Sequence, residues 1–437
     1  MLFKEEALEL GHENWTQNHV WVHKPPFFLW LMALSLKILG TTVFAVRLPS
    51  IIAGTAMVYF THGIANKLRP GSGNAAALLL ACSHWLLGLV GGSVMTDHND
   101  AIFLALVTGG FWAVLTLQGP SRVIVVGLFT GAAVLTKWLP GFVILFPWFV
   151  QCVLLDTARR PLAVRHFALA GTIALVIASA WYVHAWTSFP VEMAHENHQA
   201  ALHWNEAVEG HTGDRYFYWK ALGEVLRPFP SWIWALSLLA LCLFIEDRGW
   251  RWSIILTVVL TFAFYTLAST KMTSYVMFTL PFFVIGLVQL VMALITLLPR
   301  SFDRRIVHVL AFGSAAVALL QFGRYRRTHG DQVSGEPFFE EYRSKHLHNM
   351  DLIARTKELL PTDGPVILFN IPFPANVEFS FFTGHEALPF VPNDELVRKL
   401  MAKGYKVLVI PSGTIPLPPH AEALNLPRDE AFVVPPL

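Results

Sequence analysis

Long apolar runs alternate with short polar turns over the first 320 residues, and then the pattern stops. A helix needs roughly 20 residues to cross the hydrocarbon core of a bilayer, and the runs approach that length. We therefore predict ten membrane-spanning helices, near residues 48–66, 75–95, 101–118, 123–137, 139–155, 167–186, 228–246, 252–268, 276–298 and 306–320. A shorter run, Phe27–Gly40, begins after Pro25-Pro26 and carries Lys37, which is compatible with a helix in the membrane interface.

The residues after Leu320 follow a different pattern, in which strand-like and helix-like segments alternate. This alternation is typical of a small α/β domain. The predicted helices are Asp351–Leu360 and Asp394–Lys403, and the predicted strands are Val366–Asn370 and Val407–Pro411. We expect an external loop segment at 1–26, a transmembrane domain at 27–320 and an extracytoplasmic α/β domain at 321–437.

The composition supports a membrane protein. Apolar residues make up 54% of the chain and charged residues 14%, against about 45–50% and about 25% in soluble domains. The net charge of +2 gives no reason to expect a nucleic-acid partner. The three cysteines, Cys82, Cys152 and Cys242, lie inside apolar runs without metal-ligand spacing, so we interpret them as packing residues.

The charges in the turns predict how the helices cross the membrane. Alternate turns carry the cations Lys67, Arg69, Arg122, Arg159, Arg160, Arg165, Arg248, Arg251, Arg300, Arg304 and Arg305. Cytoplasmic loops are enriched in lysine and arginine, so we assign these turns to the cytoplasm. The other side then receives the segments with unusual polar residues: His23–Pro26, Thr96–Asp100, Thr136-Lys137, Thr187–Leu226 and Ser269–Tyr275. The C-terminal domain falls on that side too, which we expect to be the periplasm of a bacterial inner membrane.

Asp97 and Asp100 lie where one apolar run ends and the next begins. Either residue is suited to cap the following helix. Carboxylates are costly to bury at this depth and often have a function, such as binding a metal, a cation or a sugar hydroxyl. Both readings stay open from these residues alone.

Lys137 lies between two predicted spans, and Lys24 and Lys271 each border a span on the same side. A lysine at such a position can extend its ammonium to the membrane interface without any ligand. Three cations around one cavity would instead hold a phosphate or pyrophosphate through charge-assisted hydrogen bonds. Their shared side favours the second interpretation.

The loop sequence His195-Glu196-Asn197-His198, followed by His203, has helical spacing. It lacks the His-Glu-x-x-His order of a zinc site. We favour an amphipathic loop helix over a metal site.

Several short motifs follow one another in a familiar order. They are Trp15…His23-Lys24-Pro25-Pro26…Trp30, Val46-Arg47-Leu48-Pro49-Ser50, Asp97 ahead of Phe111-Trp112, Leu135-Thr136-Lys137 and Ser269-Thr270-Lys271…Tyr275. Together, over about residues 1–300, they resemble glycosyltransferase family 39, the group of protein O-mannosyltransferases and lipid A aminoarabinose transferases. His23 stands where that family commonly has a carboxylate.

The resemblance implies an α-helical GT-C fold and a polyprenyl-phosphate-linked sugar as donor, with a lipid, glycan or protein as acceptor. In that reading Lys24, Lys137 and Lys271 bind the lipid phosphate, and Tyr275 lines the cavity. Asp97 is the catalytic candidate and orients the acceptor or an ion, and Asp100 contributes to substrate binding. The cofactor is left undetermined, with a divalent metal as one option.

The family's catalytic Asp-Glu pair would fall at or before Met1, and its first transmembrane helix would precede this sequence. Glu5 and Glu6 match later positions of the motif. We therefore expect either an N-terminally shortened enzyme or an inactive copy, with little transferase activity for the chain as given. The alternative functions are a polytopic transporter and a catalytically inactive lipid-binding homologue.

Overall fold

The computed structural model describes residues 22–91, 99–154, 160–207, 211–225, 231–296, 305–328, 339–411, 416–426 and 430–434. The chain divides into two compact units, of which the larger contains Phe44–Arg324 and the smaller contains Tyr325–Leu437. Each unit has its own hydrophobic core.

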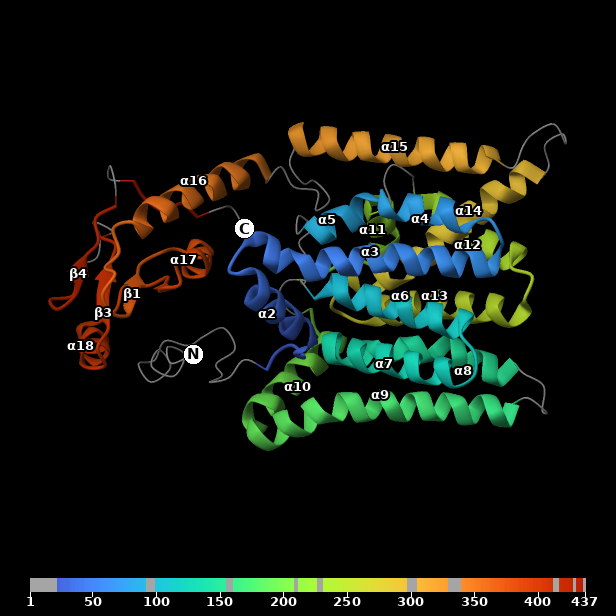
Figure 1. Ribbon diagram of the computed structural model, residues 1–437, viewed down its shortest axis with the longest axis horizontal. Coiled ribbons are helices and arrows are strands. Elements are labelled where there is room, and N and C mark those ends of the chain that lie inside the picture. The colour runs from blue at the N-terminus through green and yellow to red at the C-terminus, as the bar shows by residue number, and fades with distance from the viewer. Residues whose placement is uncertain are drawn as a thin grey trace. The chain divides into compact units, whose positions relative to one another are not determined.

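The larger unit is built from helices. In chain order they are α2 (Phe27–Leu39), α3 (Val43–Leu68), α4 (Gly73–Ala81), α5 (His84–Gly91), α6 (Asp100–Thr116), α7 (Gly119–Lys137), η1 (Leu139–Ile144), α8 (Leu145–Leu154), α9 (Arg160–Ser188), α10 (Pro190–Asn205), α11 (Phe217–Val225), α12 (Ser231–Phe244), α13 (Arg248–Leu267), η3 (Thr273–Thr279), α14 (Leu280–Thr296) and α15 (Arg305–Thr328). Figure 1 shows the long helices running alongside one another. Over the described residues, each predicted span overlaps a helix or a broken pair of helices.

By length and apolar character, five of the described helices are able to cross a membrane, namely α3, α7, α9, α13 and the continuous segment Thr273–Ile295. The predicted span 75–95 is a helix pair, α4 and α5, bent by 55°, and it would be a sixth. The predicted spans at α6, η1–α8 and α12 form shorter apolar helices in the described residues, and α15, over the predicted span 306–320, is not among the five. These helices and the fold make the chain an integral membrane protein.

Small residues allow α7 and α9 to approach each other closely. Gly127 and Gly131 lie one turn apart on α7, and a Cβ atom built on them would come within 2.7 Å and 2.8 Å of the Cβ atoms of Ile173 and Ile177. The buried positions of α9 are all alanines: Ala170, Ala174, Ala178 and Ala185. Small residues at four-residue spacing are the usual way in which membrane helices pack backbone to backbone.

The smaller unit confirms the predicted α/β domain. Its helices and strands are α16 (Phe339–Lys357), β1 (Val366–Phe369), α17 (Ala375–Thr383), β2 (Glu386–Leu388), α18 (Asp394–Ala402), β3 (Lys406–Val409) and β4 (Glu422–Ala423). The strands pair in parallel in the order β2-β1-β3-β4. The sequence did not predict α17, β2 or β4, because each is short and only partly apolar.

Candidate functional site

Asp100 and Lys137 form a buried ion pair in the larger unit. Asp100 is the first residue of α6 and Lys137 is the last residue of α7, and the Lys137 Nζ donates to Asp100 Oδ1. The side chain of Asp100 is 1% exposed and that of Lys137 is 12% exposed. A carboxylate at a helix N-terminus and an ammonium at a C-terminus each interact favourably with the helix dipole. The pair therefore stabilises both helix ends as well as both charges.

The surrounding backbone fixes this junction. The Asn99 Nδ2 donates to the Thr136 carbonyl over 3.1 Å, which ties the start of α6 to the end of α7 a second time. Helix α7 ends because Trp138 has a positive φ of 62° and Pro140 follows in η1. Proline cannot donate the backbone hydrogen bond that would continue a helix.

Helix η3 contributes two further contacts to Lys137. The Ser274 Oγ lies 3.4 Å from Lys137 Nζ, and the ring centroid of Tyr275 lies 5.5 Å from the same atom. The Phe103 ring from α6 lies 6.0 Å away. An ammonium has three N–H groups, and Asp100 and Ser274 accept from two of them. Within the described part of the chain, one donor of Lys137 therefore remains for a ligand.

Lys271 has a different environment. Its ammonium donates to the carbonyls of Thr266 at 2.6 Å, Tyr265 at 3.1 Å and Ala268, at the end of α13. These contacts use all three of its N–H groups, and the residue is 6% exposed. Burial lowers the pKa of the Lys271 ammonium. In this arrangement Lys271 caps a helix C-terminus, and a phosphate contact would have to replace one of these hydrogen bonds.

The two lysines are connected through a pair of tyrosines. The Tyr275 and Tyr265 rings stack with centroids 4.8 Å apart, and Tyr275 also lies beside Lys137. The structure therefore gathers Asp100, Lys137, Lys271 and Tyr275 into one neighbourhood.

Lys24 lies in the segment that leads into α2, next to a contact between a histidine and a glutamate. The His23 Nδ1 is 2.7 Å from Glu196 Oε2 on α10, and Glu196 is 4% exposed. Lys24 itself is half-buried. The sequence motif around His195–His198 is indeed helical, and only Met193 and Glu196 of α10 are buried.

The catalytic role assigned to Asp97 stays a prediction, because residues 92–98 lie outside the described part of the chain. Glu5 and Glu6 lie outside it as well. Among the described residues, no group of three or more histidine, cysteine, aspartate or glutamate side chains is arranged to hold a metal ion. The described residues therefore offer no cluster of that kind to a metal ion.

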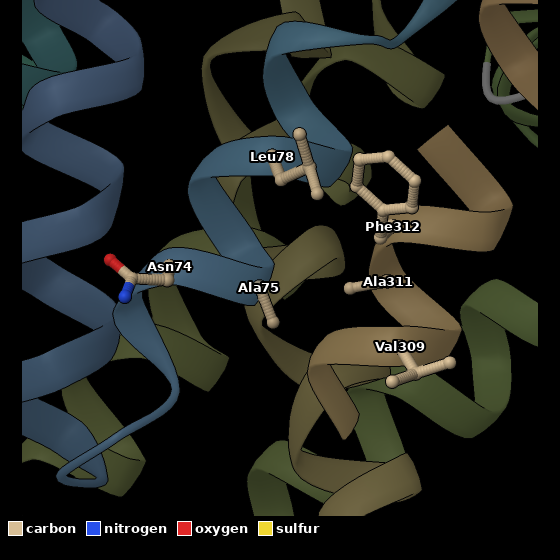
Figure 2. A pocket seen from close by; sticks show the side chains of 6 residues that line it. All are labelled: Asn74, Ala75, Leu78, Val309, Ala311 and Phe312. Carbon is tan, nitrogen blue, oxygen red and sulfur yellow. The ribbon is translucent and has the colours of Figure 1, made fainter. Parts of the chain in front are cut away.

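A groove of about 430 Å³ lies elsewhere in the larger unit, between α4 and α15. Figure 2 shows Leu78 and Ala75 of α4 facing Phe312 and Ala311 of α15, while the Asn74 amide points away from α15. The groove has no charged lining residue, so it offers no cation to a phosphate.

The contacts of two residues, Ser274 and Glu196, were not predicted from the sequence. Ser274 belongs to the Ser269–Tyr275 motif, but nothing in the sequence alone indicates that its hydroxyl reaches Lys137. Glu196 lies three residues after the apolar Met193. This helical spacing was the one sequence pattern from which the burial of Glu196 on α10 could have been predicted.

The chain is similar to known proteins both in sequence and in fold. Residues 23–184 match the family model described as dolichyl-phosphate-mannose-protein mannosyltransferase. An undecaprenyl phosphate-alpha-4-amino-4-deoxy-L-arabinose arabinosyl transferase of Pseudomonas savastanoi pv. phaseolicola (strain 1448A / Race 6) is 26% identical over 223 residues, or 48% of this chain. The match spans 39% of that relative's length.

Two crystal structures of ArnT from Cupriavidus metallidurans share the fold. The apo structure has a TM-score of 0.61 at 15% identity, over 92% of this chain and 82% of ArnT. The structure bound to undecaprenyl phosphate has a TM-score of 0.57 at 15% identity, over 91% and 82%. These comparisons confirm the resemblance to glycosyltransferase family 39: the chain has the GT-C fold of ArnT, and its residues 23–184 match the dolichyl-phosphate-mannose-protein mannosyltransferase family.

Proposed function

We propose that this protein is a membrane glycosyltransferase that moves a sugar from a polyprenyl-phosphate donor to a lipid, glycan or protein acceptor. The observation that carries the proposal is the nearly buried Lys137, whose ammonium has one N–H left for a ligand among the described residues. It lies in a chain with the fold of a protein crystallised with undecaprenyl phosphate. A lysine held in this way is suited to a lipid phosphate.

The chemistry assigned to the site is electrostatic. When the sugar leaves, negative charge grows on the departing phosphate, and a cation already in position stabilises that charge without reorganising. Lys137 and Lys24 supply the positive charge, while the ion pair with Asp100 holds the Lys137 ammonium in place. Ser274 and Tyr275 restrict the ammonium from the η3 side. Asp97 retains its proposed role of orienting the acceptor.

We place the site and the smaller unit on the periplasmic side of a bacterial inner membrane. The support is the distribution of charge: the turns at the opposite helix ends carry cations such as Lys67 at the end of α3 and Arg248 at the start of α13. If successive helices cross the membrane in alternate directions, Lys137 at the end of α7 lies on the side opposite to Lys67 and Arg248.

Affinity for undecaprenyl phosphate tests the proposal, measured on the full chain in detergent for Lys137→Ala and Lys24→Ala. A hydrogen bond to a charged group is worth roughly 1.5–3 kcal/mol, so each change should weaken binding by about tenfold to a hundredfold. The matched control is Lys403→Ala, an exposed lysine of the smaller unit, which should leave affinity unchanged.

If Lys137→Ala and Lys24→Ala bind as tightly as Lys403→Ala, the lysines do not hold the lipid phosphate and the proposal fails. Binding without sugar transfer from a polyprenyl-phosphate sugar would instead identify a lipid-binding homologue.

A further inference from the structure

Glu196 is a buried carboxylate with a partner from a distant part of the chain. It lies on α10 and is 4% exposed, and its Oε2 atom is 2.7 Å from the His23 Nδ1, across 173 positions of sequence. Taking a carboxylate out of water is costly unless a donor or an opposite charge accompanies it. The position of His23 is therefore coupled to that of α10.

Helix α10 is itself held firmly. Its Met193 packs with Val22 and Ala185 in a small apolar cluster and has no exposed surface. Beyond that cluster, the carbonyls of His203 and Trp204 at the end of α10 accept from backbone N–H groups of the segment that precedes Lys271. Glu196 is thus carried by a helix that is held both near its start and at its end.

The backbone on the other side of the pair is also restricted. Lys24 directly follows His23 and precedes Pro25 and Pro26, after which α2 begins. Each proline fixes its own φ and confines the residue before it to extended conformations. Once His23 is held, Lys24 has few ways to move its Cα atom.

We infer that Glu196 is a positioning residue that holds Lys24, through His23, against the phosphate of a polyprenyl-phosphate lipid. The inference rests on the proposed function of Lys24. Glu196 does not contact the lipid itself, since its carboxylate would repel a phosphate. It acts by fixing the residue that precedes the lysine.

A double-mutant cycle tests this inference. Undecaprenyl phosphate affinity is measured on the full chain in detergent for Glu196→Gln, Lys24→Ala and the double variant. Glu196→Gln should weaken binding by about threefold to tenfold, because coupled neighbours commonly interact at that strength. In the Lys24→Ala background the same change should have no further effect. Asn197→Ala, on the exposed face of α10, is the control and should bind like the unchanged protein.

Exchange of the pair provides the second measurement. His23→Glu combined with Glu196→His keeps one carboxylate and one imidazole in contact, so it should restore most of the affinity lost by Glu196→Gln. It also covers the case in which Glu196→Gln folds poorly, which melting temperatures would reveal.

The outcomes separate the inference from the proposed function. Unchanged affinity in Glu196→Gln, additive losses in the double variant, or a folded exchange variant with no recovery would each overturn the positioning role while leaving the Lys24 contact intact. Loss of affinity in Lys137→Ala but not in Lys24→Ala would remove Lys24 from the phosphate site, and the inference with it.

Discussion

Lys137 and Lys271 show how differently two lysines in similar turns are used. The Lys137 ammonium faces side chains, with Asp100 and Ser274 as acceptors, whereas Lys271 donates only to main-chain carbonyls at the end of α13. Carbonyls in the last turn of a helix have no partner within the helix, so a nearby cation satisfies them. Lys137 is therefore suited to binding a ligand, and Lys271 is suited to stabilising the end of α13.

Lys271→Met should therefore destabilise the protein more than it weakens lipid binding. The substitution keeps the apolar stem and removes the ammonium, so buried carbonyls lose charged hydrogen bonds worth roughly 1.5–3 kcal/mol. The melting temperature in detergent should fall clearly, while undecaprenyl phosphate affinity stays closer to the unchanged protein than that of Lys137→Ala.

Lys220→Met is the control, because Lys220 pairs with Asp214 at a side-chain exposure of 66%. Exposed pairs contribute little, so the melting temperature of this variant should hardly change. A Lys271→Met protein of normal stability that has lost its lipid would show instead that Lys271 contacts the phosphate.

At the scale of elements, the contact between α7 and α9 sets where Lys137 lies. Lys137 is the last residue of α7, and the close approach of α7 to α9 depends on Gly127 and Gly131. Membrane helices gain little from hydrophobic burial against each other, so van der Waals contact at small residues carries much of their association.

Gly127→Ala should separate the two helices and lower stability. Its new Cβ would lie 2.7 Å from the Ile173 Cβ and 3.0 Å from the Ala170 carbonyl oxygen, and neither atom is the end of a flexible side chain. Overpacking of this kind costs roughly 1–3 kcal/mol, which a melting curve in detergent would detect.

Gly171→Ala, on α9, is the matched control because its Cβ would meet only the Leu145 Cδ1 at 3.9 Å. Alanine is favoured over glycine in a helix by about 1 kcal/mol, so this variant should be as stable as the unchanged protein or more so. Equal melting temperatures for both alanine variants would contradict the close packing.

At the scale of the whole molecule, the proposed sidedness predicts which positions an impermeant thiol reagent reaches. Single cysteines are placed at Val191 on α10, at Lys403 in the smaller unit and at Lys67 at the end of α3, all exposed positions. In intact spheroplasts the first two should be labelled, and Lys67→Cys only after permeabilisation, because its turn carries the cations of the cytoplasmic side.

The three native cysteines, of which Cys242 is the least buried, are first replaced so that they give no background. Labelling of Lys67→Cys in intact cells, with Val191→Cys protected, would invert the topology. If Val191→Cys is labelled and Lys403→Cys is not, the smaller unit would be assigned to the cytoplasmic side and the assignment of α10 would stand.

The sequence by itself determined the class of the protein, the position of each apolar helix and the α/β character of the C-terminal domain. Apolar runs of near-spanning length and alternating strand and helix patterns are local signals, readable along the chain. The motifs shared with glycosyltransferase family 39 are also short stretches of sequence. They indicated that Lys24, Lys137 and Tyr275 are site residues.

Only the tertiary structure decided what these residues contact. Asp100 and Lys137 meet because α6 and α7 pack side by side, and His23 meets Glu196 across 173 positions. The tertiary structure also distinguishes Lys271 from Lys137, because the Lys271 ammonium donates to main-chain carbonyls at the end of α13. Such pairings depend on how distant segments fold together, and burial then forces each charge to find a partner, which no local pattern of residues specifies.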